Sequence, residues 1–437
     1  MFDTFKKLAM GLACLFMLAN SAQALNLELT QGIDTATPVV IYAFSAKSVK
    51  VAGNTTVSQV IANDLTLSGR FDVTPKPFDA TLNAMSTEQQ NQWQRTSIQD
   101  VVTGSIHKDI EGNWAVAVQL QDVSTQALLW HHTYHVNTDT LRATAHQISN
   151  QIFETLTGVK GVFTTKLAYI HVLGHAPGPK EYRLEVSDMD GFNPQVLVDS
   201  TMPLMSPAWS PDGQQIAYVS FEQQKATVYV QNVVDGSRVK MSDTAGLNNA
   251  PAFTADGKSL ALVQTIKGYP HIVLMALNTG KTTPLTSGYY EDTEPSFSAD
   301  GKTMLFTSTR DGGYQLYQMD LQSQAINRLT FAGNYNSSGS YFPNTQAIAF
   351  LQKHQGMFSI AKQSLTGSDG AQILDQNNTD ASPSIAPNGQ LIVYSQDYQG
   401  QRILALVSSD GQTKSRLPAM TGSVQDPAWS PFLKGES

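Results

Sequence analysis

Large apolar residues recur every 44 positions along the second half of the chain. One set belongs to a short motif that first appears as Pro207-Ala-Trp209, with Pro two positions earlier in every copy but the one at 339–341. Its members are Trp209, Phe253, Phe297, Tyr341, Ile385 and Trp429. A second set keeps the same spacing, at Tyr218, Leu262, Phe306, Phe350 and Tyr394. The units hold short β-rich runs bounded by turns such as Asp212-Gly213. Four antiparallel strands per unit of this length are typical of one blade of a β-propeller.

The two ends of the repeat predict the number of blades and the way the ring closes. Residues 167–170 read as the second strand of a blade that has no inner strand before it. Residues 427–430 read as an inner strand with nothing after it. We therefore expect the C-terminal strand to complete the first blade, which removes two open sheet edges. The prediction for residues 163–437 is a six-bladed β-propeller closed by the C-terminal strand.

Residues 38–162 lack the repeat and predict a small α/β N-terminal domain. Strands are expected at 39–44, 101–106, 114–123 and 128–136. Val57, Val60, Ile61 and Leu65 have the spacing of a helix that ends near Gly69, and a long amphipathic helix from Leu141 to Leu156 stops at Gly158.

Residues 1–24 predict a secretory signal. Lys6 and Lys7 precede an apolar run at 8–19, and Ala22-Gln-Ala24 follows, which favours cleavage after Ala24. The run is shorter than the roughly 20 residues that span a bilayer, so we expect an exported chain that is not membrane-spanning. Cys14 leaves a lipoprotein signal as the rival interpretation, although the residues before it fit a lipoprotein box poorly.

Residues 25–37 predict an extended arm in which leucines alternate with polar residues. No local pairing partner is evident for this short strand, so a free arm is one interpretation.

Charge and composition narrow the possible partners. The net charge is −8, with 41% hydrophobic and 15% charged residues. An acidic chain of this kind argues against nucleic acid or anionic lipid as the main partner. Cys14 is the one cysteine, so removal of the signal leaves a chain without thiol or disulfide chemistry.

No convincing catalytic, metal or cofactor site is expected. Gly257-Lys258-Ser259 resembles the end of a phosphate-binding loop, but the required earlier Gly is Ala252. His131 and His135 would share a strand face at about 13 Å, too far apart to bind one metal directly. A propeller hydrolase or lyase, or an ion- or ligand-binding propeller, stays open as the alternative function.

The remaining candidate is a binding surface. Asp-Gly turns occupy one face of the predicted disk, and the loops of the other face differ between units while their frame repeats. Varied loops on a rigid ring suit partner recognition, although ordinary solvated loops are an equal alternative.

The layout resembles the TolB family, the periplasmic component of the Tol–Pal envelope system of Gram-negative bacteria. The resemblance covers essentially the whole mature chain. Its markers are the arm from Leu27 to Asp34, the stretch Leu141-Arg142-Ala-Thr-Ala145-His146, the segment Leu156-Thr157-Gly158, and the closing Pro427-Ala-Trp429-Ser-Pro. The unit at 339–345 departs from the repeat, because it lacks the Pro and Asp-Gly of the others.

The resemblance implies a non-enzymatic adaptor without a cofactor, located in the periplasm. In that family the propeller loops bind Pal, an outer-membrane lipoprotein, and the arm binds the C-terminal domain of TolA, which is anchored in the inner membrane. Pal binding is associated with withdrawal of the arm. The system supports outer-membrane invagination in cell division and envelope integrity, and partners can include other outer-membrane proteins and bacteriocins.

Carried over by position, the resemblance assigns two sets of binding residues. The TolA-binding arm would comprise Leu27, Glu28, Leu29, Thr30, Gln31, Gly32, Ile33 and Asp34. The Pal-binding propeller face would include Asn248, Asn249, Thr293, Glu294, Asn336, Asp380 and Asp426.

Overall fold

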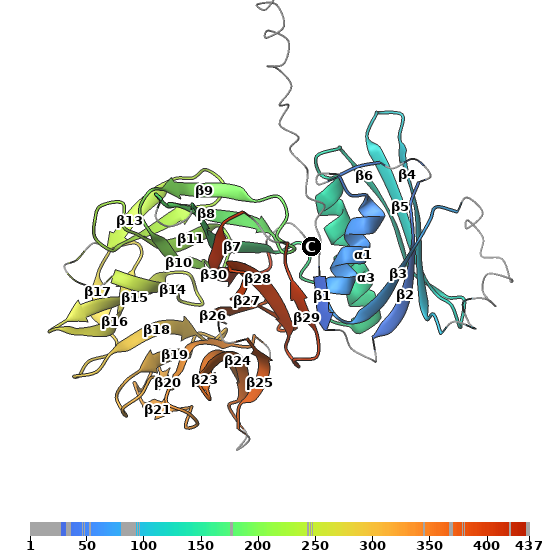
Figure 1. Cartoon of the computed structure of the whole chain (residues 1–437). Coiled ribbons are helices and arrows are strands. Elements are labelled where there is room, and N and C mark those ends of the chain that lie inside the picture. Colours follow the sequence, from blue (N-terminus) through green and yellow to red (C-terminus); the bar gives the residue numbers. More distant parts are fainter. Residues whose placement is uncertain are drawn as a thin grey trace, which may run out of the picture.

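The protein is built from a six-bladed β-propeller and a small α/β unit that lies beside it (Figure 1). This computed structural model describes residues 28–31, 36–45, 47, 49–51, 54–79, 93, 95, 97–174, 178–242, 244, 246, 248–343, 346–366, 370–377, 379, 381–418 and 421–433. The predicted signal segment lies outside these residues. No helix among the described residues has the length and apolar composition needed to cross a bilayer.

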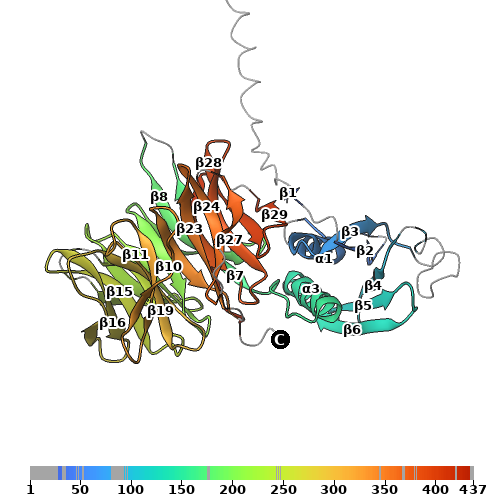
Figure 2. The same ribbon diagram turned by 90° about the horizontal axis from the view of Figure 1, so that it is seen from below.

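The α/β unit is a five-stranded sheet whose strand order is β3-β2-β4-β5-β6. Strand β2 pairs in parallel with β3 and β4, and the remaining pairs are antiparallel. Helices α1 and α3 lie between this sheet and the propeller (Figures 1 and 2). The elements are β2 (Thr37–Tyr42), α1 (Val57–Leu67), β3 (Phe71–Lys76), β4 (Asp100–Lys108), β5 (Trp114–Asp122), β6 (Leu128–Val136) and α3 (Leu141–Thr157).

The helix boundaries follow from local chemistry. At the start of α1, the Thr56 hydroxyl accepts from the Gln59 backbone N–H, and the Gln59 side chain accepts from the Thr56 N–H. This reciprocal capping satisfies donors that the first helical turn leaves free. At the end of α3, Gly158 adopts a φ of 70°, the left-handed cap that glycine accommodates without steric cost. Both helices lie where the sequence pattern places them.

Strand β3 is the element that the sequence pattern did not predict. Its run from Phe71 to Lys76 contains Pro75, which removes a backbone donor and argues against a strand. In the structure β3 is an edge strand and pairs only with β2, so the missing donor is tolerated.

Each propeller blade is an antiparallel sheet of four propeller strands, and we number the blades one to six along the ring. Blade one is β30 (Ser423–Trp429), β7 (Lys166–Leu173), β8 (Glu181–Asp188) and β9 (Gln195–Ser200); blade two is β10 (Leu204–Trp209), β11 (Gln215–Ser220), β12 (Thr227–Asn232) and β13 (Arg238–Ser242); blade three is β14 (Asn248–Phe253), β15 (Ser259–Ile266), β16 (Tyr269–Ala276) and β17 (Thr282–Pro284). Blade four is β18 (Asp292–Phe297), β19 (Thr303–Ser308), β20 (Gln315–Asp320) and β21 (Ile326–Arg328); blade five is β22 (Asn336–Tyr341), β23 (Ala347–His354), β24 (Met357–Ser364) and β25 (Gln372–Gln376); blade six is β26 (Ala381–Ile385), β27 (Leu391–Tyr398), β28 (Gln401–Ser408) and β29 (Lys414–Arg416).

The ring closes as the sequence predicts. The C-terminal strand β30 pairs with β7, with Trp429 opposite Leu167, and supplies the inner strand of blade one. The fold class and the blade count are therefore confirmed. The second apolar set is buried throughout, with side chains exposed by at most 1%, at Tyr218, Leu262, Phe306, Phe350 and Tyr394. These residues form the inter-blade core and explain why the 44-residue spacing holds.

The two units share one continuous apolar core. Phe153 of α3 packs edge-to-face on Phe163, which precedes the propeller, with ring centroids 5.7 Å apart. Both belong to the same buried cluster as Trp429 of blade one and Leu406 of blade six. The α/β unit is thus held against blades one and six by burial of apolar surface.

Candidate functional site

A ring of six backbone bulges surrounds the axis of the propeller. In each inner strand the pairing register shifts at one position, and the residue there has a φ between 44° and 54°. The six residues are spaced by 44, at Ser206, Ala250, Glu294, Ser338, Ser382 and Asp426. Positive φ is uncommon for residues with a side chain, so its recurrence marks a built feature of the fold. All six line the central channel, a cavity of about 450 Å³.

Two carboxylates stand on opposite sides of this ring. Glu294 belongs to blade four and Asp426 to blade one, three blades apart in either direction. The Glu294 carboxylate accepts from the Ser338 backbone N–H at 2.7 Å and from the Ser338 hydroxyl at 3.0 Å. The Asp426 carboxylate accepts from the Ser206 N–H at 3.2 Å and from the Ser382 hydroxyl at 3.1 Å. Each acidic side chain therefore links its blade to a neighbour as well as facing the channel.

The predicted Pal-binding residues fall into two groups. Asn248 and Asn336 are fully buried, and their amides tie the loops that lead into the inner strands. Asn248 accepts from the Ser242 hydroxyl at 2.7 Å and donates to the backbone carbonyl of Thr244 at 2.8 Å. These two asparagines shape the loop face without presenting a side chain on it.

The other described members of that set are half-buried: Asn249, Thr293, Glu294 and Asp426. Glu294 and Asp426 line the central channel, and Asn249 and Thr293 each stand one residue before a channel-lining position. Asn249 accepts from the Ala250 backbone N–H at 2.7 Å. Asp380 lies outside the described residues. The channel lining thus contains two of the predicted residues, Glu294 and Asp426.

The leading strand β1 (Glu28–Gln31) is docked on the propeller. It pairs antiparallel with β29 and becomes a fifth strand at the outer edge of blade six (Figures 1 and 2). Leu29, whose side chain is 42% exposed, lies opposite Ser415. Leu27, Gly32, Ile33 and Asp34 of the predicted arm lie outside the described residues.

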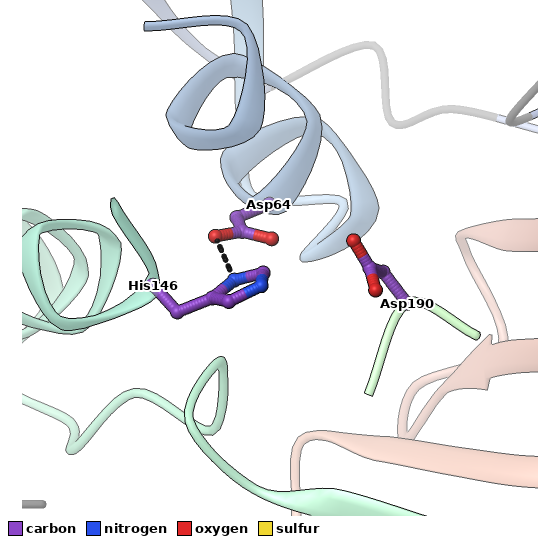
Figure 3. A group of neighbouring side chains, drawn as sticks. All are labelled: Asp64, His146 and Asp190. Carbon is purple, nitrogen blue, oxygen red and sulfur yellow. Dashed lines mark hydrogen bonds and ion pairs between the residues drawn. The ribbon is translucent and has the colours of Figure 1, made fainter. Parts of the chain in front are cut away.

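A third feature, a buried group of charged side chains, lies at the joint between the α/β unit and the propeller (Figure 3). Asp64 of α1 accepts from His146 Nδ1 of α3 at 2.8 Å. Arg142, one turn before His146, donates its Nε–H to Asp188 at 3.0 Å and a second N–H to Asp190 in the β8–β9 turn. Lys166 Nζ donates to Asp188 at 2.7 Å.

These contacts shift the proton affinities of the joint residues. Burial alone would lower the pKa of His146, but the attraction and hydrogen bond of Asp64, reinforced by Asp190 and Asp188, raise it above its usual value. Burial would raise the pKa of Asp188, but Lys166 and His146 hold it below its usual value. Burial raises the pKa of Asp64.

The joint contains the residue types of a metal site, but a cationic side chain among them disfavours a bound metal ion. Among the described residues, Asp64, His146 and Asp190 form the one group whose ligand atoms lie within 4.8 Å of one another. Arg142 is already bound to Asp190, so a divalent cation there would be repelled by a guanidinium. We therefore interpret the group as an ion-pair network.

Comparison with known proteins places the chain in a family. A family model described as the TolB beta propeller domain matches residues 153–433, and one described as the TolB amino-terminal domain matches residues 25–129. The propeller match alone covers more than half of the chain.

This chain belongs to the TolB family.

Individual relatives agree with this assignment. The chain is 44% identical over 230 residues to the Tol-Pal system protein TolB of Coxiella burnetii, an alignment that covers 52% of this chain and 53% of the relative. It is 41% identical over 240 residues to the protein of the same name from Legionella pneumophila, covering 54% and 55% of the two chains. The alignments thus span about half the length of these curated TolB relatives.

A solved TolB structure extends the comparison to nearly the whole chain. The crystal structure of TolB from Acinetobacter baumannii superimposes with a TM-score of 0.83 at 33% identity, covering 93% of this chain and 100% of that one. The predicted family is confirmed.

The buried joint is the site that sequence reasoning missed. Arg142 and His146 stand four residues apart on one face of an amphipathic helix, and they belong to a stretch that marks the TolB resemblance. Two ionisable residues next to the apolar stripe of Leu141 and Ala145 were the available signal that α3 buries charge.

Proposed function

We propose that this TolB-family chain is a non-enzymatic periplasmic adaptor of the Tol–Pal system. Its propeller loop face binds Pal of the outer membrane, and its leading segment binds the C-terminal domain of TolA of the inner membrane. It thereby supports outer-membrane invagination in cell division and envelope integrity. The observation that carries the proposal is the match of both family models, because it covers the two parts of the chain to which the two partners are assigned.

The geometry of the leading strand supports the TolA part of the proposal. Strand β1 is held by backbone pairing along one edge only, and its register covers three residue pairs. An edge strand held in this way can exchange its pairing partner for another sheet edge, since backbone hydrogen bonds supply most of the affinity. In the docked position β29 occupies one edge of β1, so a TolA sheet that takes over this edge must first release β1 from β29.

The channel mouth supports the Pal part. Glu294 and Asp426 line the channel and offer carboxylate groups. Asn249 and Thr293, each one residue before a channel-lining position of an inner strand, offer an amide and a hydroxyl group. A rigid ring fixes their spacing before a partner arrives, which lowers the entropic cost of binding.

Crosslinking in the intact envelope, followed by recovery of the chain and its partners, tests the proposal. We expect enrichment of TolA and of an outer-membrane lipoprotein of the Pal type. Recovery of neither protein, or turnover of a polysaccharide or peptide by the purified chain, would contradict it.

A further inference from the structure

A network of six ionisable side chains joins three elements at the boundary between the α/β unit and the propeller. Helix α1 contributes Asp64, α3 contributes Arg142 and His146, and blade one contributes Lys166, Asp188 and Asp190. All but Lys166 are buried. The network therefore sits in a medium where an unbalanced charge is costly.

With all three of its carboxylates ionised, the joint balances its charges only when His146 is protonated. Three carboxylates face two permanent cations, Arg142 and Lys166. The group is neutral when His146 is an imidazolium and carries one excess negative charge when it is not. Arg142 also stacks its guanidinium over the Phe192 ring, 3.9 Å from the centroid, so the cation is fixed in place.

The geometry of the imidazole fits the protonated form. Nδ1 donates to Asp64 at 2.8 Å, and Nε2 lies 3.8 Å from the Asp188 carboxylate, an ion-pair distance. Nε2 has no hydrogen-bond partner, so a neutral ring with this tautomer would direct a lone pair into a carboxylate-rich pocket. Figure 3 shows the ring between α1 and the turn that carries Asp190.

We propose that His146 is a proton-operated latch that holds the α/β unit against blade one. With the proton in place, the imidazolium joins Asp64 of one unit to Asp188 of the other. Without it, the joint buries a net negative charge and loosens. The inference does not depend on which partners the protein binds.

The direction of the pH response follows from the raised pKa of His146. The pKa of His146 is raised in the folded protein, so its contribution to the joint is fully present below about 6.5, the ordinary histidine value. The contribution is lost as the pH rises through the folded pKa, which lies above that value. The latch is thus closed in acid and opens in alkali. The groups that face the ring from the surrounding elements are Asp64, Arg142, Lys166, Asp188 and Asp190.

A pair of spin labels can follow the joint directly. Cys14→Ser removes the one native cysteine, and Ile110→Cys and Val234→Cys place labels at exposed turns of the two units. Electron–electron double resonance between pH 5.5 and 9.5 is expected to give one narrow distance distribution in acid. The fraction of molecules with a broader distance distribution should grow at least threefold in alkali. This change should follow the titration of a single proton with its midpoint above pH 6.5.

Two variants and a direct titration of His146 show whether this residue, rather than another titrating group, causes the change in distance. His146→Gln is expected to give the broad distribution at every pH, whereas His131→Gln, on the exposed strand β6, should respond like the parent. Nitrogen-edited NMR of His146 in the parent chain should give the same midpoint as the distance change, which tests the idea even where a variant fails to fold. The proposal would be overturned by a distance distribution that stays the same across the pH range, or by a titration midpoint of His146 below 6.5. It would also be overturned if added Zn²⁺ restored the narrow distance distribution at high pH.

Discussion

Leu29 of the leading strand lies directly opposite Ser415, near the other end of the chain. This pairing makes β1 the fifth strand of blade six and gives the arm a defined docked position. Coupling between an arm and a distant site requires two competing arm positions, of which this is one.

Amide exchange in the leading strand should respond to Pal. The strand is held along one edge, and Leu29 is substantially exposed, so we expect its amides to exchange faster than those of β28. If Pal favours the docked position, saturating Pal should slow exchange across residues 28–31. Hydrogen–deuterium exchange with mass spectrometry measures this, and an unchanged or faster rate would contradict the coupling.

Substitutions on the two sides of the channel test where Pal binds. Glu294→Lys should weaken Pal binding about tenfold or more, because it reverses a charge at the opening. Asp426→Lys is the matched variant across the ring and should have a similar effect if Pal covers the axis. Calorimetric titration gives both affinities. Since each carboxylate also links neighbouring blades, the melting temperature must be recorded alongside, and parental affinity in both variants would count against the channel mouth.

Asn248 should matter for stability more than for contact. Asn248→Ala removes a fully buried amide that ties its loop to Ser242 and Thr244, and should cost about 1–3 kcal/mol in the free energy of unfolding. Asn327→Ala, at an exposed position of β21, is the control and should stay within about 0.5 kcal/mol of the parent. Urea denaturation compares them, and equal effects would refute the buried role.

Asp100 gives the α/β unit a pH-dependent stability of its own. Burial, with a contribution from Asp122 on the paired strand, raises its pKa to about 6. A raised carboxyl pKa means that the folded state binds the proton more tightly, so stability falls as the pH rises from about 4 to about 6. Asp100→Asn should therefore be more stable than the parent at pH 7.5 and equal to it near pH 4. Denaturation monitored by tryptophan fluorescence at both pH values decides this, and the same difference at both would contradict it.

The sequence predicts the propeller well because its core repeats. Tyr218 and Phe306 are large, apolar and locked at a constant spacing, and the structure buries them completely. The unpaired inner strand at the C-terminus then leaves one way to close the ring. Strand β3 escaped prediction because Pro75 is tolerated only at an edge, which depends on tertiary context.

The binding surfaces are harder to predict because polar residues near the loops have two possible roles. Asn248 of β14 and Glu294 of β18 both follow polar loops in the sequence, yet the first is buried and ties the loop before it while the second faces the channel. The joint network is harder still, since Asp64, His146 and Asp190 are far apart in the chain and meet only once both units are packed. The docking of β1 also depends on an edge that another blade provides.

Removal of residues 25–36 is the most direct test of the two-site adaptor. The variant loses the leading strand but keeps all six blades, so calorimetric titration should find parental affinity for Pal and no binding to the C-terminal domain of TolA. Retained TolA binding, or loss of Pal binding in a variant with parental circular dichroism, would contradict the assignment of one partner to each end of the molecule.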